Sequence, residues 1–139
     1  MEMALQKQEQ ILCKALHTDL GKSKTESVMC EIGLVQGEIR WMKQHLGRLC
    51  RQKHVRTSLA QFAAKSYQSP SPYGNVLIMS PWNYPVLLTL EPLVDAIAAG
   101  NTAVVKPSAY APVSANVLKD LLEEWIVKDS VCRKDMKSL

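Results

Sequence analysis

The fold is decided by Val-Leu-Ile-Met-Ser-Pro-Trp-Asn-Tyr-Pro at residues 76–85 and by Gly-Asn-Thr-Ala-Val-Val-Lys-Pro-Ser at residues 100–108. The first stretch opens with a short, fully apolar run, which is typical of a strand covered on both faces. Its two prolines end the strand and begin a loop. The second stretch follows a helix stop signal, Gly100-Asn101, and contains another β-branched, apolar strand. Residues 86–99 between them carry a broad apolar face that predicts a helix.

A second helix is predicted after the second strand, from about Ser114 as N-cap to about Trp125. Strand, helix, strand and helix with short connections form a right-handed parallel unit. Pro92 should kink the first of these helices or mark its true first turn. Asn83 and Lys106 follow the two strands, at the carboxyl ends where such sheets bind ligands. The pattern therefore predicts half of a binding site.

At these residues the chain resembles the aldehyde dehydrogenase superfamily, in particular its class 3 (fatty-aldehyde-type) branch. The resemblance covers about residues 4–124, is strongest over 74–108, and corresponds to roughly the first quarter of a full-length member. It implies an α/β fold, in which N-terminal helices precede an incomplete Rossmann-like parallel βαβα unit of the cofactor domain. It also implies the N-terminal portion of an NAD(P)-dependent enzyme that oxidises an aldehyde to a carboxylic acid.

The resemblance also implies roles for individual residues. Asn83 would be the oxyanion-hole donor, Lys106 would hold the adenosine ribose of NAD or NADP, and Tyr84 would line the aldehyde channel. The cofactor-binding set would be Ser80, Pro81, Trp82, Lys106 and Ser108. Taken without the resemblance, an asparagine after a strand is more often a turn former, a lysine there is usually solvated, and the aromatics could simply pack.

Some features of the family do not occur in these residues. Ala109 stands where the family often has an acidic residue that shares the ribose hydroxyls. The family's Glu-Leu-Gly-Gly and Gly-Gln-x-Cys motifs are absent, and Cys132, in a polar stretch beside basic residues, lacks the surrounding motif of a catalytic thiol. We therefore expect no turnover by the isolated chain. The alternative is a non-catalytic pseudoenzyme fragment or a dimerisation module.

The chain is expected to divide into a helical segment (1–63), a strand or arm used in oligomerisation (64–73), a partial cofactor-binding unit (74–124) and an atypical tail (125–139). A frameshift or premature stop would produce such a tail. Residues 23–26 form a capping box. An apolar seam with heptad spacing then predicts either a coiled coil or, because glycines interrupt it, a long helix packed on its own domain; its members are Val28, Ile32, Val35, Ile39, Met42, Leu46 and Leu49.

Composition limits the remaining classes of function. The 139 residues are 47% hydrophobic, enough for one domain, and the net charge is +4. The basic cluster at residues 48–56 lacks the aromatic residues that stack on bases, so no nucleic acid is expected. No transmembrane segment, secretion signal or metal-ligand spacing occurs, and four scattered cysteines indicate a reducing cytoplasm. The partners implied by the resemblance are a small-molecule aldehyde and a second copy of the chain in a homodimer.

Overall fold

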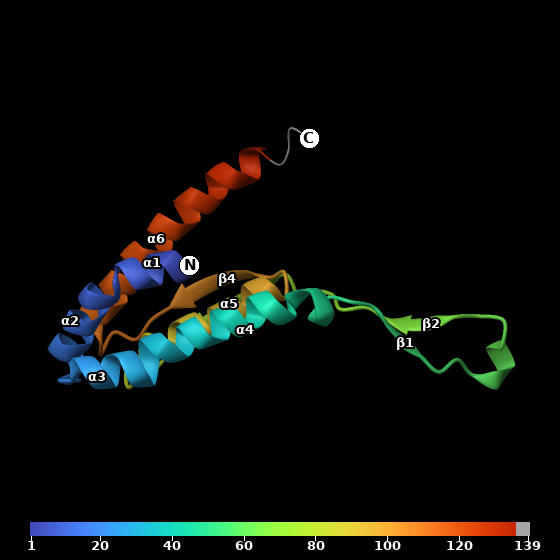
Figure 1. Ribbon diagram of the computed structural model, residues 1–139, viewed down its shortest axis with the longest axis horizontal. Coiled ribbons are helices and arrows are strands. Elements are labelled where there is room, and N and C mark those ends of the chain that lie inside the picture. Colours follow the sequence, from blue (N-terminus) through green and yellow to red (C-terminus); the bar gives the residue numbers. More distant parts are fainter. Residues whose placement is uncertain (136–139) are drawn as a thin grey trace.

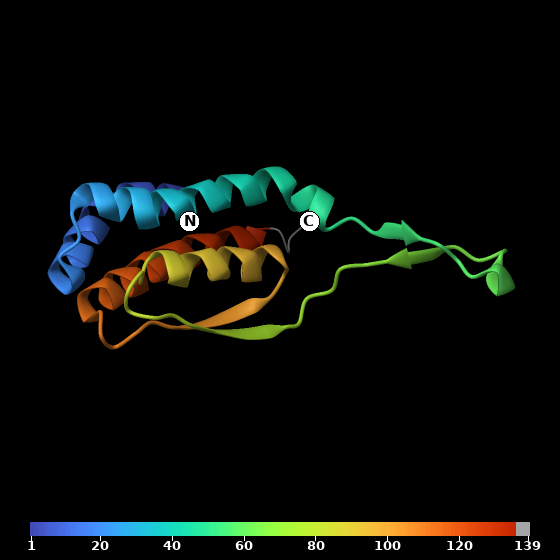
Figure 2. The ribbon, with the colours of Figure 1, turned by 90° about the horizontal axis from the view of Figure 1, so that it is seen from below.

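The computed structural model describes the backbone of residues 1–135 and the side chains of residues 1–125. Its body has three layers, in which α5 and α6 lie between the N-terminal helices and a sheet of two strands (Figure 2). A long arm leaves one end of the body (Figure 1). The elements in chain order are α1 (Glu2–Lys7), α2 (Glu9–Leu20), α3 (Lys24–Ser27), η1 (Val28–Ile32), α4 (Gly33–Leu49), β1 (Lys53–Val55), η2 (Leu59–Gln61), β2 (Ser66–Gln68), β3 (Asn75–Met79), α5 (Leu87–Ala98), β4 (Thr102–Lys106) and α6 (Pro112–Asp135).

The strand–helix–strand–helix unit predicted from the sequence is present as β3, α5, β4 and α6. β3 and β4 pair in parallel, with Asn75 opposite Thr102 and Met79 opposite Lys106. Gly100 ends the connection from α5 with a φ of 82°, which an L side chain rarely adopts. The predicted α/β class and the predicted parallel pairing are therefore confirmed.

The sheet is covered on one face only. Ile78, on the face that meets the helices, is 8% exposed, whereas Leu77, Met79 and Val104 on the other face are 60%, 65% and 65% exposed. Because the helices of the described chain all lie on one side of the sheet (Figure 2), nothing here packs against the second face. The expectation of a strand covered on both faces is wrong for the described residues.

One hydrophobic core joins the helices to the inner face of the sheet. Its fully buried side chains are Leu5, Leu12, Leu16, Ile32, Val35, Val86, Leu90, Leu118 and Leu121. The apolar seam belongs to this core as far as Met42: Ile32, Val35 and Ile39 are buried, Val28 and Met42 are partly buried against the core, and Leu46 and Leu49 are exposed. The seam is thus a helix packed on its own domain, as its glycines suggested.

The ends of the helices agree with the sequence at some residues and differ at others. Ser23 caps α3 as predicted, since its Oγ accepts a hydrogen bond from the Glu26 amide at 3.1 Å. At the N-terminus, Gln8 separates α1 from α2, and Gly21 caps the end of α2 in the left-handed conformation. Pro92 lies inside α5, so the prediction that it marks the first turn is wrong.

Helix α6 starts at Pro112, and Ser114 is not its N-cap. The Ser114 hydroxyl is buried without a hydrogen-bond partner. The carboxylate of Asp19, at the end of α2, instead accepts hydrogen bonds from the amides of Val113 at 3.3 Å and Ser114 at 2.7 Å. The N-cap of α6 is therefore a side chain of α2, a helix that is far away in the sequence but lies next to α6 in space. α6 continues into the predicted tail, but the side chains from residue 126 onward, Cys132 included, lie outside the described residues.

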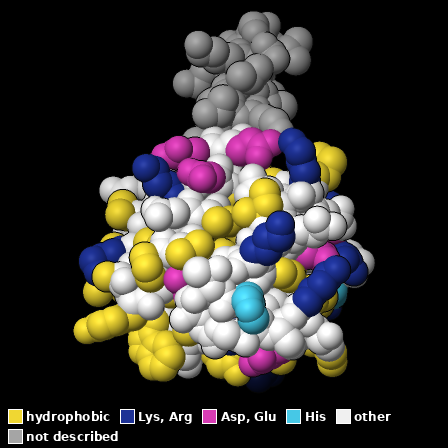
Figure 3. Space-filling model, turned by 90° about the vertical axis from the view of Figure 1, so that its left-hand side faces the viewer, with side chains coloured by type: hydrophobic (Ala, Val, Ile, Leu, Met, Phe, Trp, Pro, Cys, Tyr) yellow, Lys and Arg dark blue, Asp and Glu magenta, His cyan; other side chains and the backbone are white. Residues whose placement is uncertain are grey.

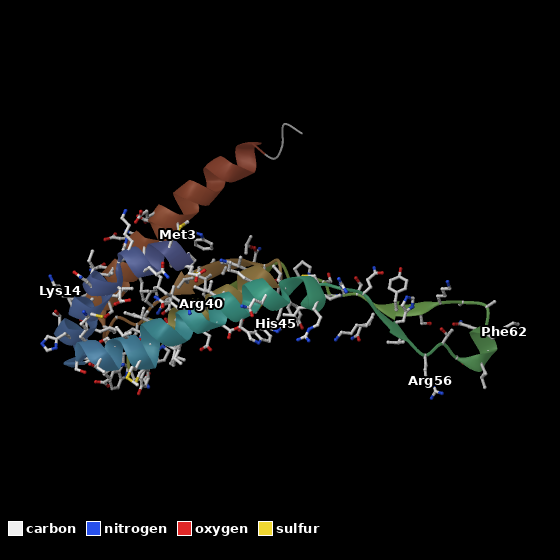
Figure 4. The ribbon with its side chains drawn as sticks, viewed as in Figure 1. Met3, Lys14, Arg40, His45, Arg56 and Phe62 are labelled. Carbon is white, nitrogen blue, oxygen red and sulfur yellow. The ribbon has the colours of Figure 1, made fainter. Side chains whose placement is uncertain are left out.

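The arm is an antiparallel hairpin of β1 and β2, in which Lys53 lies opposite Gln68. The helical part ends at Leu49, earlier than the expected residue 63, and within 64–73 only Ser66–Gln68 forms a strand. Phe62 lies near the tip (Figure 4), where it is 87% exposed. The arm thus exposes apolar side chains away from the body.

Within the described part of the chain, no helix has the length and apolar character needed to cross a membrane.

Candidate functional site

Residues 80–86, which join β3 to α5 and are called the Asn83 loop, leave the same edge of the sheet at which β4 ends with Lys106. Met79 and Lys106 are register partners at the carboxyl ends of β3 and β4, and the Ser80 amide donates to the Lys106 carbonyl at 3.2 Å. The side chains of Asn83 and Lys106 are both exposed at this edge. The parallel register thus brings together the two polar residues that were singled out in the sequence.

The side chain of Ser80 faces inward and is only 8% exposed. Its Oγ lies 2.6 Å from Oγ1 of Thr89, a fully buried residue of α5 that also lies 2.5 Å from the Pro85 carbonyl oxygen. These contacts tie the start and the end of the loop to the same helix. Ser80 therefore presents only its backbone to the edge of the sheet.

The aromatic residues of the loop differ in their surroundings. Trp82 is 53% exposed, while Tyr84 is 37% exposed and its ring lies under an ammonium group, with Lys22 Nζ 3.8 Å from the ring centroid. On the second loop, Ser108 Oγ accepts a hydrogen bond from the Tyr110 amide at 3.2 Å. The Ser108 side chain is thus engaged in a local turn.

A buried ion pair, missed in the sequence, lies behind the Asn83 loop. Lys22 Nζ donates to Glu31 Oε1 at 2.7 Å and to the Asn83 carbonyl at 2.8 Å. Glu31 Oε2 accepts from the amides of Val86 at 2.8 Å and Leu87 at 3.2 Å. Lys22 is 8% exposed and Glu31 is fully buried. The one sequence signal that could have found Glu31 was its place two residues before Gly33, a glycine inside a helical pattern.

Among the side chains that the structure describes, no thiol or free carboxylate accompanies Asn83. Cys13, Cys30 and Cys50 are unbridged and lie on the N-terminal helices or just after them. Burial raises the pKa of the Cys13 thiol, which keeps that thiol protonated and unreactive. No group of three or more potential metal ligands occurs within the described ranges. The edge therefore offers an amide donor and an ammonium group, without a nucleophile or a base.

A pocket of about 650 Å³ lies elsewhere, on α2 and the turn that leads into α3. Figure 3 shows this end of the molecule, where lysine side chains lie among apolar ones. The residues that line the pocket are Gln10, Cys13, Lys14, His17, Thr18, Lys22 and Lys24. Lys22 is the one residue it shares with the contacts behind the Asn83 loop.

Comparison with known proteins shows which family has this architecture. The model of the aldehyde dehydrogenase family matches residues 1–133. The chain belongs to the aldehyde dehydrogenase family. The match includes residues 125–133, which are part of the tail that was expected to be atypical.

Individual members of the family are similar over most of this chain. The 4,4'-diaponeurosporen-aldehyde dehydrogenase of Staphylococcus aureus is 44% identical over 124 residues, which are 89% of this chain and 27% of that protein. Aldehyde dehydrogenase family 3 member A2 of Rattus norvegicus is 38% identical over 90% of this chain and 26% of its own length. These family 3 relatives agree with the class 3 resemblance.

A solved structure, described as the substrate-bound state of Staphylococcus aureus AldH, has the same fold. It superposes with a TM-score of 0.86 at 45% sequence identity and covers 88% of this chain and 27% of that chain. The chain thus spans about a quarter of the length of the relatives it matches.

Proposed function

We propose that this chain is the N-terminal portion of an NAD(P)-dependent aldehyde dehydrogenase, which oxidises an aldehyde to a carboxylic acid. The observation that carries the proposal is the parallel register of β3 and β4, because it brings the Asn83 loop and Lys106 to one edge of the sheet. The family membership supports the same reaction class. Cys13, Cys30 and Cys50 are unbridged, which supports a reducing, cytoplasmic setting.

Asn83 would act on the aldehyde oxygen. When a nucleophile adds to the carbonyl carbon, negative charge develops on that oxygen, and an amide N–H held in place lowers the energy of the charged state. The backbone carbonyl of Asn83 accepts a hydrogen bond from Lys22, while the Asn83 side chain is exposed. The side-chain amide is therefore free to donate. Tyr84 beside it would contact an apolar aldehyde.

Lys106 would hold the nicotinamide cofactor, which accepts a hydride from the substrate when bound. The fit is supported by the exposed ammonium group of Lys106 at the carboxyl end of β4, which forms none of the ion pairs found among the described side chains. Pro81 and Trp82 are exposed and follow β3 at the same edge. Ser108 would contribute through its backbone, because its hydroxyl accepts the Tyr110 amide.

The isolated chain is expected to be inactive, since neither a nucleophile nor a base accompanies Asn83 among the described side chains. A chimera tests the function instead. Residues 1–125 of this chain replace the matching quarter of the Staphylococcus aureus relative, and reduced nicotinamide is measured by absorbance with decanal and NAD or NADP. We expect turnover by the chimera and none by the isolated chain.

The variant Asn83→Ala in this chimera should lower kcat by roughly 10²- to 10³-fold, as the loss of an oxyanion donor does. Lys106→Met should raise KM for the cofactor while leaving kcat nearly unchanged. Asn116→Ala is the matched control, because it removes the same side-chain amide from an exposed position on α6. Equal activity of the Asn83→Ala and Asn116→Ala chimeras would contradict the proposed role.

A second function, dimerisation, is favoured by the arm. The tip exposes Leu59 and Phe62 at 92% and 87%, and the outer edges of β1 and β2 are open to pairing. Apolar side chains at the end of an extended hairpin are typical of a contact with another chain. Light scattering of the purified chain would test whether a second copy binds there.

A further inference from the structure

The ion pair behind the Asn83 loop depends on a local irregularity of the helix that carries Glu31. Glu31 lies in the π-helical turn η1, between α3 and α4. Gly33 allows this turn, because a Cβ atom at residue 33 would lie 2.8 Å from the Val28 carbonyl oxygen. Single π-helical turns occur frequently at functional sites. Here the turn accompanies a carboxylate that is fully buried.

Glu31 binds the chain just after the loop. Its Oε2 accepts hydrogen bonds from the amides of Val86 and Leu87, where α5 begins. These amides have no acceptor within the helix, and the N-terminus of a helix attracts negative charge. The carboxylate therefore fixes where α5 starts and, with it, the end of the loop.

Lys22 binds the loop on its other side. The ammonium group donates to Glu31 and to the Asn83 carbonyl, and it lies over the Tyr84 ring. The stretch from Asn83 to Leu87 is thus held at both ends by one ion pair, with the buried Pro85 between them. Lys22 holds the backbone carbonyl of Asn83, and the Asn83 side chain stays exposed at the edge of the sheet.

The Lys22–Glu31 ion pair is expected to add little to the free energy of unfolding. Removing two charges from water costs about as much as their attraction returns, and apolar replacements of buried pairs are often equally stable. The pair does provide fixed geometry, which an oxyanion donor needs to within about 0.5 Å. We infer that Lys22 and Glu31 are positioning residues, which hold the main chain of Asn83 so that its amide projects toward the aldehyde site. The role of that amide rests on the proposed function.

The test uses the 139-residue chain, without aldehyde or nicotinamide. Nuclear magnetic resonance measures backbone order at residues 82–84 and hydrogen exchange of the Val86 and Leu87 amides. In Glu31→Gln the single remaining oxygen cannot serve both Lys22 and the amides. We expect the order of residues 82–84 to fall and the exchange of both amides to accelerate roughly tenfold or more, as when a hydrogen bond to a charged group is lost.

Glu2→Gln is the matched control, because it removes a carboxylate that pairs with Arg40 and Lys43 on the surface. The control should leave residues 82–87 unchanged. In Glu31→Gln the amides that join β3 to β4 should keep their protection, which a general loss of stability would lower as well. Unchanged exchange at Val86 and Leu87, or an equal acceleration throughout the chain, would overturn the inference.

The wild-type chain provides a test that needs no variant. Lys22 methylene protons beside the Tyr84 ring should resonate upfield of ordinary lysines, and residues 82–84 should be as ordered as β3. A loop as mobile as the tip of the arm, without that upfield shift, would overturn the inference. An ordered loop combined with an inactive chimera would instead overturn the proposed function alone.

Discussion

Replacing Asp19 should weaken the junction of α2 and α6, because its carboxylate caps α6 from the end of α2. Asp19 lies near the end of α2 and accepts the amides of Val113 and Ser114 at 3.3 and 2.7 Å. The Asp19→Ala variant removes the N-cap of α6 although the residue lies 95 positions away from Ser114. Both amides then lose their acceptor, and the Ser114 amide is only partly open to water.

The expected loss follows from two contributions. Removing an N-cap side chain destabilises a protein by about 0.5–2 kcal/mol. Removing a negative charge from a helix N-terminus adds about 0.3–1 kcal/mol. For a partly buried cap with two hydrogen bonds, we expect Asp19→Ala to lower the free energy of unfolding by about 2 kcal/mol in total. Asp19→Asn keeps one acceptor oxygen and loses the charge, so we expect about half that loss.

Urea unfolding followed by circular dichroism measures the effect. With a urea dependence of about 2 kcal/mol per molar, the midpoint of Asp19→Ala should fall by about 1 M. Asp120→Ala is the control, since Asp120 is exposed on α6 and its loss should change stability by less than about 0.5 kcal/mol. An Asp19→Ala midpoint equal to that of the control would refute the capping argument.

Three further predictions concern other parts of the chain. Ser114→Ala removes a buried hydroxyl without a partner, so urea unfolding should show unchanged or slightly raised stability. Burial raises the pKa of the Cys13 thiol, so its contribution to stability should be lost as pH rises above about 8.5, and thiol reagents should modify Cys50 well before Cys13. If the arm mediates dimerisation, Leu59→Ser with Phe62→Ser should halve the mass seen by light scattering, whereas an unchanged dimer mass would place the contact elsewhere.

The sequence predicted the α/β unit well because local signals agree there. The apolar run of β3, the stop at Gly100 and the β-branched run of β4 each specify one element and its end. Short connections then leave parallel pairing as the natural arrangement. The edge that carries Asn83 and Lys106 follows from that topology without knowledge of any side-chain contact.

The groups that hold the site could not be predicted in the same way. Asp19, Lys22 and Glu31 are charged residues in a helical region, where charged side chains are usually solvated. Their roles depend on partners far away in the sequence, 61 residues for Lys22–Asn83 and 95 residues for Asp19–Ser114, and local periodicity carries no information about such partners. The uncovered face of the sheet was missed for a related reason, since an apolar strand has the same pattern whether or not a layer covers it.

The contact between α2 and α6 also sets an order of events during synthesis. A ribosome adds about 5–20 residues per second, so the 95 residues between Asp19 and Ser114 take roughly 5–20 s to appear. During that interval the apolar side chains of α1 and α2 have no α6 to pack against. The nascent N-terminal helices therefore keep part of their apolar surface exposed until α6 has been made.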